Sequence, residues 1–378
     1  MSADPIFTAE HELFRDQVRK FVQREIAPFH AQWEKDKRVP KEVWRKAGEA
    51  GLLCMTMPEE YGGGGADVLH SIILGEELAR VAATGPGFGL HSDIIAPYIN
   101  NAGSEEQKKK WLPRMASGET IAAIAMTEPG AGSDLQNIKT AARRDGNHFV
   151  INGQKTFISN GQNADLVVVV AKTDPKEGAK GTTLFLVETD REGFRRGRNL
   201  EKIGRKAQDT SELFFDNVRV PPENMLGGEG QGFMCLMREL PRERMLIATN
   251  ALAAIDAALE TTLDYVKQRK AFGKAIIEFQ NSKFKLAELK TEALVARTFV
   301  EHCLRLLMQN KLDVTTAAMA KLYCTDLQGK VVDECLQLHG GYGYMWEYPI
   351  ARLWADARVQ RIFGGANEIM KELIGRSL

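Results

Sequence analysis

Thr127-Glu128-Pro129-Gly130-Ala131-Gly132-Ser133-Asp134 is the stretch at which the pattern of this 378-residue chain changes from helix-like to strand-like. Its small residues leave backbone N–H groups free and leave room for a bulky ligand, and Thr127 and Ser133 add hydroxyl groups. A loop that binds an anionic or heteroaromatic ligand and a plain turn between domains are both compatible with these residues. The patterns on either side of the loop indicate the fold class.

The residues before this loop read mainly as helix. Thr8 is a suitable N-cap, and Pro28 ends the first apolar stripe. That stripe has the roughly 3.6-residue period of an amphipathic helix and consists of Phe14, Val18, Phe21, Val22 and Ile26. Gly62–Gly65 predicts a loop, and Ser71–Val81 is expected to form another helix.

The residues after the loop carry strand signals. The β-branched and aromatic runs are Val167–Val170, Thr183–Val187 and Leu213–Phe215. Turn signals occur at Asp145-Gly146-Asn147 and Ile151-Asn152-Gly153. Because no helical pattern separates these short strands, an antiparallel β domain is expected here.

Long helices follow residue 232, and two of them carry one broad apolar stripe each. The stripes are Leu252, Ile255, Leu259, Leu263 and Val266, then Leu286, Leu289, Ala293, Ala296, Val300, Cys303 and Leu307. Such helices with short connections favour an up-and-down bundle. The predicted fold is α+β and mostly α, with an N-terminal helical domain (1–120), a middle antiparallel β domain (121–232) and a C-terminal helical bundle (233–378).

Composition excludes several classes of function. Fifty Lys and Arg balance fifty Asp and Glu, so no net positive field can hold nucleic acid or an anionic membrane. No apolar run approaches the ~20 residues of a membrane span. The N-terminus, MSADPIFTAEHELF, lacks the basic and apolar segments of a leader, so a cytoplasmic protein is expected.

Motifs for several other chemistries are missing from the sequence. No Gly-x-Ser-x-Gly elbow, Walker pattern or metal-ligand spacing occurs, so no metal site is expected. The five cysteines are scattered and expected to be reduced and buried. His91 and His339 are isolated, and both are expected to serve packing or hydrogen bonding.

Five stretches, taken together in order and spacing, resemble the acyl-CoA dehydrogenase family. They are Ala125–Asp134 (AMTEPGAGSD), Ile151–Gly161 (INGQKTFISNG), Gln268–Lys274 (QRKAFGK), Gln337–Gly343 (QLHGGYG) and Ile362–Ile369 (IFGGANEI). Tyr344–Pro349 and Asn367–Leu373 are most similar to its long-chain branch. The family fold, a helical domain, a β domain and a four-helix bundle, agrees with the pattern above. The resemblance implies an FAD-dependent enzyme that oxidises acyl-CoA thioesters.

In the family the flavin lies between the β domain and the bundle. The positions that the resemblance assigns to the cofactor within one subunit are Met126, Thr127, Gly132, Ser133, Phe157, Ser159 and Asn367. Thr127 matches a hydroxyl that bonds the pyrimidine end of the ring, and Ser159 matches a hydroxyl beside N5. Ser133 also matches a contact to substrate. Phe157 matches a ring that shields the flavin edge, although the residues alone favour a core ring of the β domain.

A second set of positions matches the site at which a neighbouring subunit contacts the FAD diphosphate and adenosine. This set consists of Arg269, Phe272, Gln280, Gln337, Gly340 and Gly341. A guanidinium fork suits a diphosphate, although Arg269 alone would read as a solvated helix end. The resemblance therefore implies a homotetramer built as a dimer of dimers.

The reaction needs a carboxylate that removes the α-proton while the β-hydrogen leaves as hydride to flavin N5. Many family members carry it in the turn Phe363-Gly364-Gly365, where this chain has Gly364. The long-chain and isovaleryl branches place it on the first helix of the bundle, and Glu243 matches that position. Arg244 matches an arginine near the substrate, and the small Gly364 is expected to admit the Glu243 side chain.

Rival assignments remain open for the base. Glu239, one helical turn earlier, is expected on the surface. Glu368 is expected to be a first-turn acid that the helix dipole favours. From the residues alone, Glu243 would be an exposed helix residue between two arginines.

The resemblance also implies how the thioester is held and where the electrons go. The backbone N–H of Gly364 and the ribityl hydroxyl of FAD would bond the thioester oxygen, and Phe363 is a further substrate-binding position. A medium- or long-chain acyl-CoA is the expected substrate, with electron-transfer flavoprotein as acceptor. The alternatives are an oxidase that uses oxygen and a non-catalytic scaffold that binds flavin or acyl-CoA.

Overall fold

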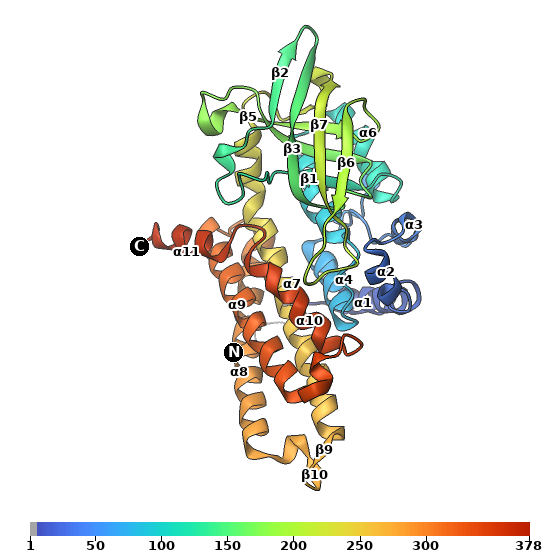
Figure 1. Cartoon of the computed structure of the whole chain (residues 1–378), viewed down its shortest axis with the longest axis vertical. Helices are drawn as coiled ribbons and strands as arrows, with labels where there is room; N and C mark the ends of the chain where they lie inside the picture. The colour runs from blue at the N-terminus through green and yellow to red at the C-terminus, as the bar shows by residue number, and fades with distance from the viewer. Residues whose placement is uncertain (1–5) are drawn as a thin grey trace.

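The chain folds into a sheet-containing end, a group of N-terminal helices beside it and a long helical bundle (Figure 1). The structure, a computed structural model, describes residues 6–378. Residues 1–5, which open the segment in which no leader was expected, lie outside the described residues.

The N-terminal region is helical, as predicted. It contains α1 (Ala9–Phe21), α2 (His30–Asp36), α3 (Lys41–Glu49), α4 (Val68–Arg80), α5 (Ala96–Ala102), α6 (Glu105–Ala116), two π-helical turns (Val22–Ile26, Leu90–Ile95) and a 3-10 turn (Glu59–Tyr61). Thr8 caps α1 by accepting the backbone N–H of His11. The helix predicted at Ser71 begins earlier, at Val68, because the Asp67 side chain accepts the N–H of Leu69 and caps it there.

The middle region is one eight-stranded sheet, ordered β6-β7-β3-β2-β4-β5-β8, with β1 beside β4. Its strands are β1 (Ala122–Ala125), β2 (Ala141–Asp145), β3 (His148–Ser159), β4 (Leu166–Lys172), β5 (Thr182–Glu188), β6 (Phe194–Asn199), β7 (Thr210–Val220) and β8 (Met225–Leu226). Short 3-10 turns lie at Leu135–Asn137, Gly178–Gly181 and Pro222–Asn224. The pairing is antiparallel except for β1 with β4 and β2 with β4, which are parallel. Ile151-Asn152-Gly153 is not a turn, since it lies inside β3 at a shift of register against β7.

Strand β4 is buried on both faces, which explains its unbroken valine run. Val167 and Val169 point into the core of the sheet domain. Val168 and Val170 point to the other side, into the cluster that contains Tyr98 of α5. This packing fixes α5 against the sheet and sets the position of the Tyr98 side chain.

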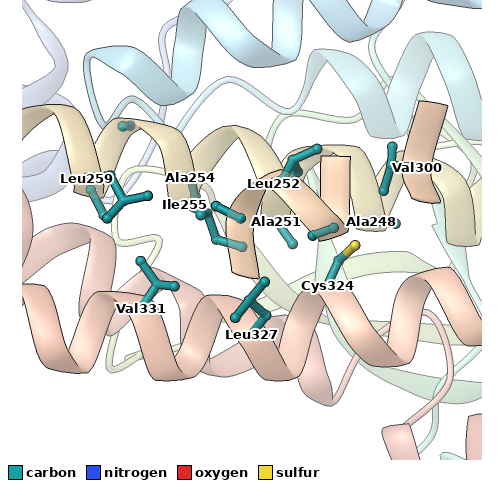
Figure 2. Close-up of a cluster of buried hydrophobic side chains, with 14 of the residues drawn as sticks. Ala248, Ala251, Leu252, Ala254, Ile255, Leu259, Val300, Cys324, Leu327 and Val331 are labelled. Atoms are coloured by element: carbon teal, nitrogen blue, oxygen red, sulfur yellow. The ribbon is translucent and has the colours of Figure 1, made fainter. Parts of the chain in front are cut away.

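The C-terminal region is a bundle around α7 (Gly232–Gln268). Its other elements are β9 (Lys270–Ala271), β10 (Lys274–Ala275), α8 (Gln280–Met308), α9 (Val314–His339), α10 (Pro349–Ala357), α11 (Asn367–Gly375) and 3-10 turns at Ile276–Glu278, Gly340–Tyr344 and Arg358–Arg361. Figure 2 shows Ile255 and Leu259 of α7 beside Leu327 and Val331 of α9. Buried residues of both predicted stripes form this core.

Helix α7 is, among the described residues, the helix long and apolar enough to cross a membrane. Within its most apolar window, 67% is buried inside the protein. Its length and apolar character are accounted for by its place in the middle of the bundle. That the chain has no membrane span remains a prediction.

Candidate active site

The centre of the site is a contact between α5 and α7. Glu243 of α7 is only 5% exposed, and its Oε1 accepts a hydrogen bond of 2.7 Å from the Tyr98 hydroxyl. One turn earlier on α7, Glu239 Oε1 accepts a bond of 2.9 Å from Asn101 Nδ2. Glu243 is therefore not an exposed helix residue between two arginines.

The environment of Glu243 raises its pKa from the ordinary 4.5 to about 7. Burial is the main cause, because it disfavours the charged carboxylate, and the negative charge of Glu239 adds to it. The Tyr98 hydrogen bond and the Arg244 charge act in the opposite direction. A carboxylate with a pKa near neutrality is suited to taking and releasing a proton.

The structure contradicts the expected surface position of Glu239 and agrees with the expected position of Glu368. Glu239 is buried, not on the surface, because α5 covers this face of α7 and Asn101 supplies its partner. Glu368 is exposed in the first turn of α11, where an acid is favoured.

Gly364 faces α7 just beyond Glu243. A Cβ added to Gly364 would lie 2.2 Å from Cδ1 of Ile247, and the φ of Gly364 is +62°. Ile247 therefore occupies the space beside Gly364, and that the small Gly364 admits the Glu243 side chain stays a prediction. Ile247 lies four residues beyond Glu243, which is about 6 Å along a helix. The turn thus contacts a residue that lies one helical turn beyond Glu243 and two beyond Glu239 on α7.

Gly364→Ala is expected to lower the free energy of unfolding by about 1–2 kcal/mol, because alanine is strained at positive φ and its methyl group would overlap Ile247. Chemical denaturation of the two proteins measures the difference. In a double-mutant cycle, Gly364→Ala should cost less in an Ile247→Ala background than in the parent, because only the steric overlap is relieved there. A Gly364→Ala protein as stable as the parent would contradict this account.

Lys321 of α9 holds the same turn in place. Its buried ammonium donates to the carbonyl of Gly365 (2.9 Å) and to Oδ1 of Asn367 (2.6 Å). The amide nitrogen of Asn367 donates to Thr325 and Asp326. Because the Asn367 amide is used inside the bundle, the structure does not support its predicted role as a cofactor ligand. Lys321 has no role in the sequence prediction, and its only sequence signal is a lysine within an apolar helix pattern.

Arg244 supplies unpaired donors beside Glu243. The side chain is 3% exposed, yet its Nε and Nη1 have no hydrogen-bond partner. Burial lowers the pKa of this guanidinium, and the carboxylate of Glu243 opposes that effect. A buried cation with free donors suits a polar or anionic ligand group, and the role of Arg244 near the substrate stays a prediction.

A buried ion pair between Lys155 and Glu128 fixes the loop that follows β1. Lys155 Nζ donates to the carbonyl of Met126 and to Glu128 Oε1, both at 2.9 Å. Glu128 also accepts the N–H groups of Lys139 and Thr140. Thr127 lies between Met126 and Glu128, the two residues that Lys155 contacts, and its carbonyl accepts the N–H of Thr156 at 2.9 Å. Sequence reasoning missed this pair, although both residues lie in the motifs that carry the resemblance.

The same loop leaves open space on its outer side. Gly132 and Ser133 are exposed, and a Cβ on Gly130 or Gly132 would meet no atom within 4 Å. Met126 and Thr127 are half-buried. The residues present therefore fit a large ligand against the loop, as a flavin would require.

Phe157 and Ser159 lie at the end of β3, near this loop. Phe157 is 66% exposed with φ +60°, at a shift of register between β3 and β7. The alternative that Phe157 is a core ring is therefore wrong, because the bulge turns it outward. An exposed ring is available to cover a planar ligand, and the half-buried Ser159 adds a hydroxyl.

The second set of predicted cofactor residues lies at the far end of the bundle, near β9 and β10, away from the sheet (Figure 1). Every member is exposed: Arg269, Phe272, Gln280, Gln337, Gly340 and Gly341. Phe272 is 96% exposed, and the guanidinium of Arg269 lies 5.4 Å from the Tyr342 ring centroid. One chain does not bring this set to the Thr127 loop.

Phe363 adds an exposed ring beside Gly364, with the Arg205 guanidinium 5.7 Å from its centroid.

His91 and His339 are buried and hydrogen-bonded to backbone carbonyls, as expected. Four cysteines are buried and Cys235 is half-buried, all of them free.

Three potential metal ligands, His11, Asp67 and His70, meet away from this site, within 4.8 Å of one another. Such a set was not visible in the sequence, because His11 and Asp67 are 56 positions apart. Both histidines are hydrogen-bonded to Asp67, at 3.2 and 3.0 Å, which accounts for the arrangement.

Comparison with known proteins gives one family over nearly the whole chain. Models of the acyl-CoA dehydrogenase N-terminal, middle and C-terminal domains match residues 8–119, 123–218 and 230–378. The long-chain specific acyl-CoA dehydrogenase of Mus musculus mitochondria is 54% identical over 99% of this chain and 87% of its own length.

Solved structures are similar to this chain over nearly its whole length. An acyl-CoA dehydrogenase from Geobacillus kaustophilus has a TM-score of 0.97 at 49% identity and 99% coverage of both chains. A chain from a study of the electron transferring flavoprotein of Acidaminococcus fermentans has a TM-score of 0.95 at 36% identity and 99% coverage of both. A Mycobacterium smegmatis glutaryl-CoA dehydrogenase in complex with FADH2 has a TM-score of 0.92 at 30% identity, covering 100% of this chain and 96% of its own.

Proposed function

This chain belongs to the acyl-CoA dehydrogenase family of flavoprotein oxidoreductases, and from that premise we propose that it converts a medium- or long-chain fatty acyl-CoA into the trans-2-enoyl-CoA, with Glu243 as the base. The observation that carries the proposal is the buried carboxylate of Glu243, one helical turn from Ile247, which the Gly364 turn contacts. Its pKa of about 7 supports the role of a base at neutral pH.

Glu243, Gly364 and Arg244 each have a role in the proposed reaction. Glu243 removes the α-proton, and the N–H of Gly364 donates to the thioester oxygen, which makes that proton more acidic. The free donors of Arg244 hold a polar group beside Glu243. FAD, when bound, supplies the acceptor for the hydride from the β-carbon.

The loop after β1 and the end of β3 would hold the flavin. Thr127 and Ser159 offer hydroxyls, Gly132 and Ser133 offer open space, and Phe157 offers an exposed ring that keeps water away. The structural relative solved with FADH2 supports the choice of cofactor.

The exposed set at the far end of the bundle would complete the FAD site of a neighbouring subunit in a homotetramer. Its distance from the loop of its own chain supports this proposal (Figure 1). Light scattering of the FAD-bound protein tests it, and a monomer that retains FAD would contradict it.

The proposed acyl chain length and electron acceptor rest on the similar proteins described above. The long-chain specific enzyme at 54% identity favours straight long chains, and the similarity to a chain from an electron transferring flavoprotein study supports that acceptor. Each electron pair would leave the protein through such a partner.

Anaerobic titration of the yellow FAD protein with acyl-CoAs of increasing chain length tests the function. We expect bleaching of the flavin, formation of 2-enoyl-CoA and the tightest response with medium or long chains. Hydrogen peroxide formed during aerobic turnover would favour the oxidase instead. Binding of acyl-CoA without bleaching would favour the scaffold.

A further inference from the structure

The contact between α5 and α7 contains two parallel hydrogen bonds to two carboxylates. Tyr98 donates to Glu243 at 2.7 Å, and Asn101 donates to Glu239 at 2.9 Å. The donors are three residues apart on α5 and the acceptors four apart on α7, so both bonds join facing sides of the two helices. Only the first bond reaches the proposed base.

Burial and packing fix the Tyr98 side chain in this position. It is 1% exposed, and its ring packs in the cluster formed with Ile95 and Ile99 of the same segment and Leu166 and Val168 of β4. Burial and the neighbouring Glu243 raise the pKa of its phenol, so its hydroxyl stays protonated and remains a donor. The Tyr98 hydroxyl bonds Oε1 of Glu243 and not Oε2.

Resting on the proposed function, we propose that Tyr98 is a positioning residue for the base: its hydroxyl fixes Oε1 of Glu243, leaves Oε2 to take the substrate proton, and favours the charged form of the carboxylate. A hydrogen bond to an ionised acceptor is stronger than one to a neutral acid. The Tyr98 bond therefore opposes the burial that would otherwise keep Glu243 protonated.

The other charged groups around Glu243 do not replace this donor. On α7, Glu239 disfavours the carboxylate and Arg244 favours it. On α9, Lys321 acts on Arg244 and is engaged with Gly365 and Asn367. On α5, Tyr98 is the residue that donates to Glu243, while Asn101 is turned to Glu239.

Tyr98→Phe tests the proposal, because it removes the hydroxyl and keeps the buried ring. The acid limb of the pH profile of kcat/KM should move up by about one pH unit, the effect of losing one charge-assisted bond. At pH 6 kcat/KM should fall about tenfold, and well above the new limb it should approach the parent value. Infrared titration of the Glu243 carboxyl, identified as the band lost in Glu243→Gln, should show the same shift without turnover.

Asn101→Ala is the matched control, since it removes the other hydrogen bond between the same helices. Its acid limb should not move up, because Asn101 donates to Glu239 and not to Glu243. A parental limb in Tyr98→Phe, or equal shifts in the two variants, would overturn the proposal, because the bond would then serve only helix packing. Failure of the proposed function is separate: the parent protein would not be bleached by acyl-CoA at any pH.

Discussion

Glu243→Gln is expected to slow reduction of the flavin by acyl-CoA by about 10²- to 10⁴-fold, the range that a positioned general base contributes. Glutamine has the shape of glutamate and can still accept the Tyr98 hydrogen bond, but it cannot take the α-proton. FAD and acyl-CoA binding should persist, because neither is assigned to this carboxylate. Stopped-flow measurement of flavin bleaching under anaerobic conditions gives the rate.

Glu239→Gln is the control for this variant, as it makes the same change one turn away in the same buried contact. It should still be bleached by substrate, with its acid limb moved to lower pH, because a like charge near Glu243 is removed. If Glu243→Gln were bleached normally and Glu239→Gln were not, the base would be Glu239.

The stability of Glu243→Gln should separate loss of chemistry from loss of fold. Folding raises the pKa of Glu243 from 4.5 to about 7, so the folded state binds more protons and stability falls as pH rises through that window. Glutamine removes this dependence. Above pH 7 the variant should therefore be at least as stable as the parent, which thermal unfolding at pH 6 and 8 measures.

Lys155→Met is expected to lower the free energy of unfolding by about 3–5 kcal/mol, because it leaves the buried carboxylate of Glu128 without its cation. Methionine keeps the length and flexibility of the side chain. The pair also holds the carbonyl of Met126, so the loop at Thr127 should loosen and FAD affinity should fall. Denaturant unfolding and FAD release measure the two effects.

The double variant Lys155→Met with Glu128→Gln is the matched control. It removes the buried charge that Lys155→Met leaves behind, so it should recover a large part of the lost stability. The N–H groups of Lys139 and Thr140, which donate to Glu128, can donate in part to the glutamine oxygen instead. A single variant as stable as the parent would show that the pair does not support the loop.

The sequence was informative where the signal is local. The capping residue Thr8, the valine run in β4 and the apolar stripes of α7 and α8 each set a helix or strand through neighbours in the chain. The motifs around Thr127 and Gly364 identified the family and the chemistry it needs. Glu243 was named from its place in such a motif, and its role remains a proposal.

The sequence was wrong or silent where a partner comes from far along the chain. Glu239 was expected on the surface, but α5 buries it. Phe157 alone suggested a core ring, but a shift of register in β3 turns it outward. A side chain at Gly364 would meet Ile247, a contact that the sequence does not show.

The sequence by itself determined the family, the order of helices and strands, and the residue types available for catalysis, because these depend on spacing along the chain. Only the tertiary structure decided which carboxylate is buried beside which donor. Tyr98 and Glu243 are 145 positions apart, and their bond exists because α5 is fixed between the sheet and α7. Burial and hydrogen bonding set the proton affinity of a carboxylate, so the property on which the proposed reaction depends arises from packing.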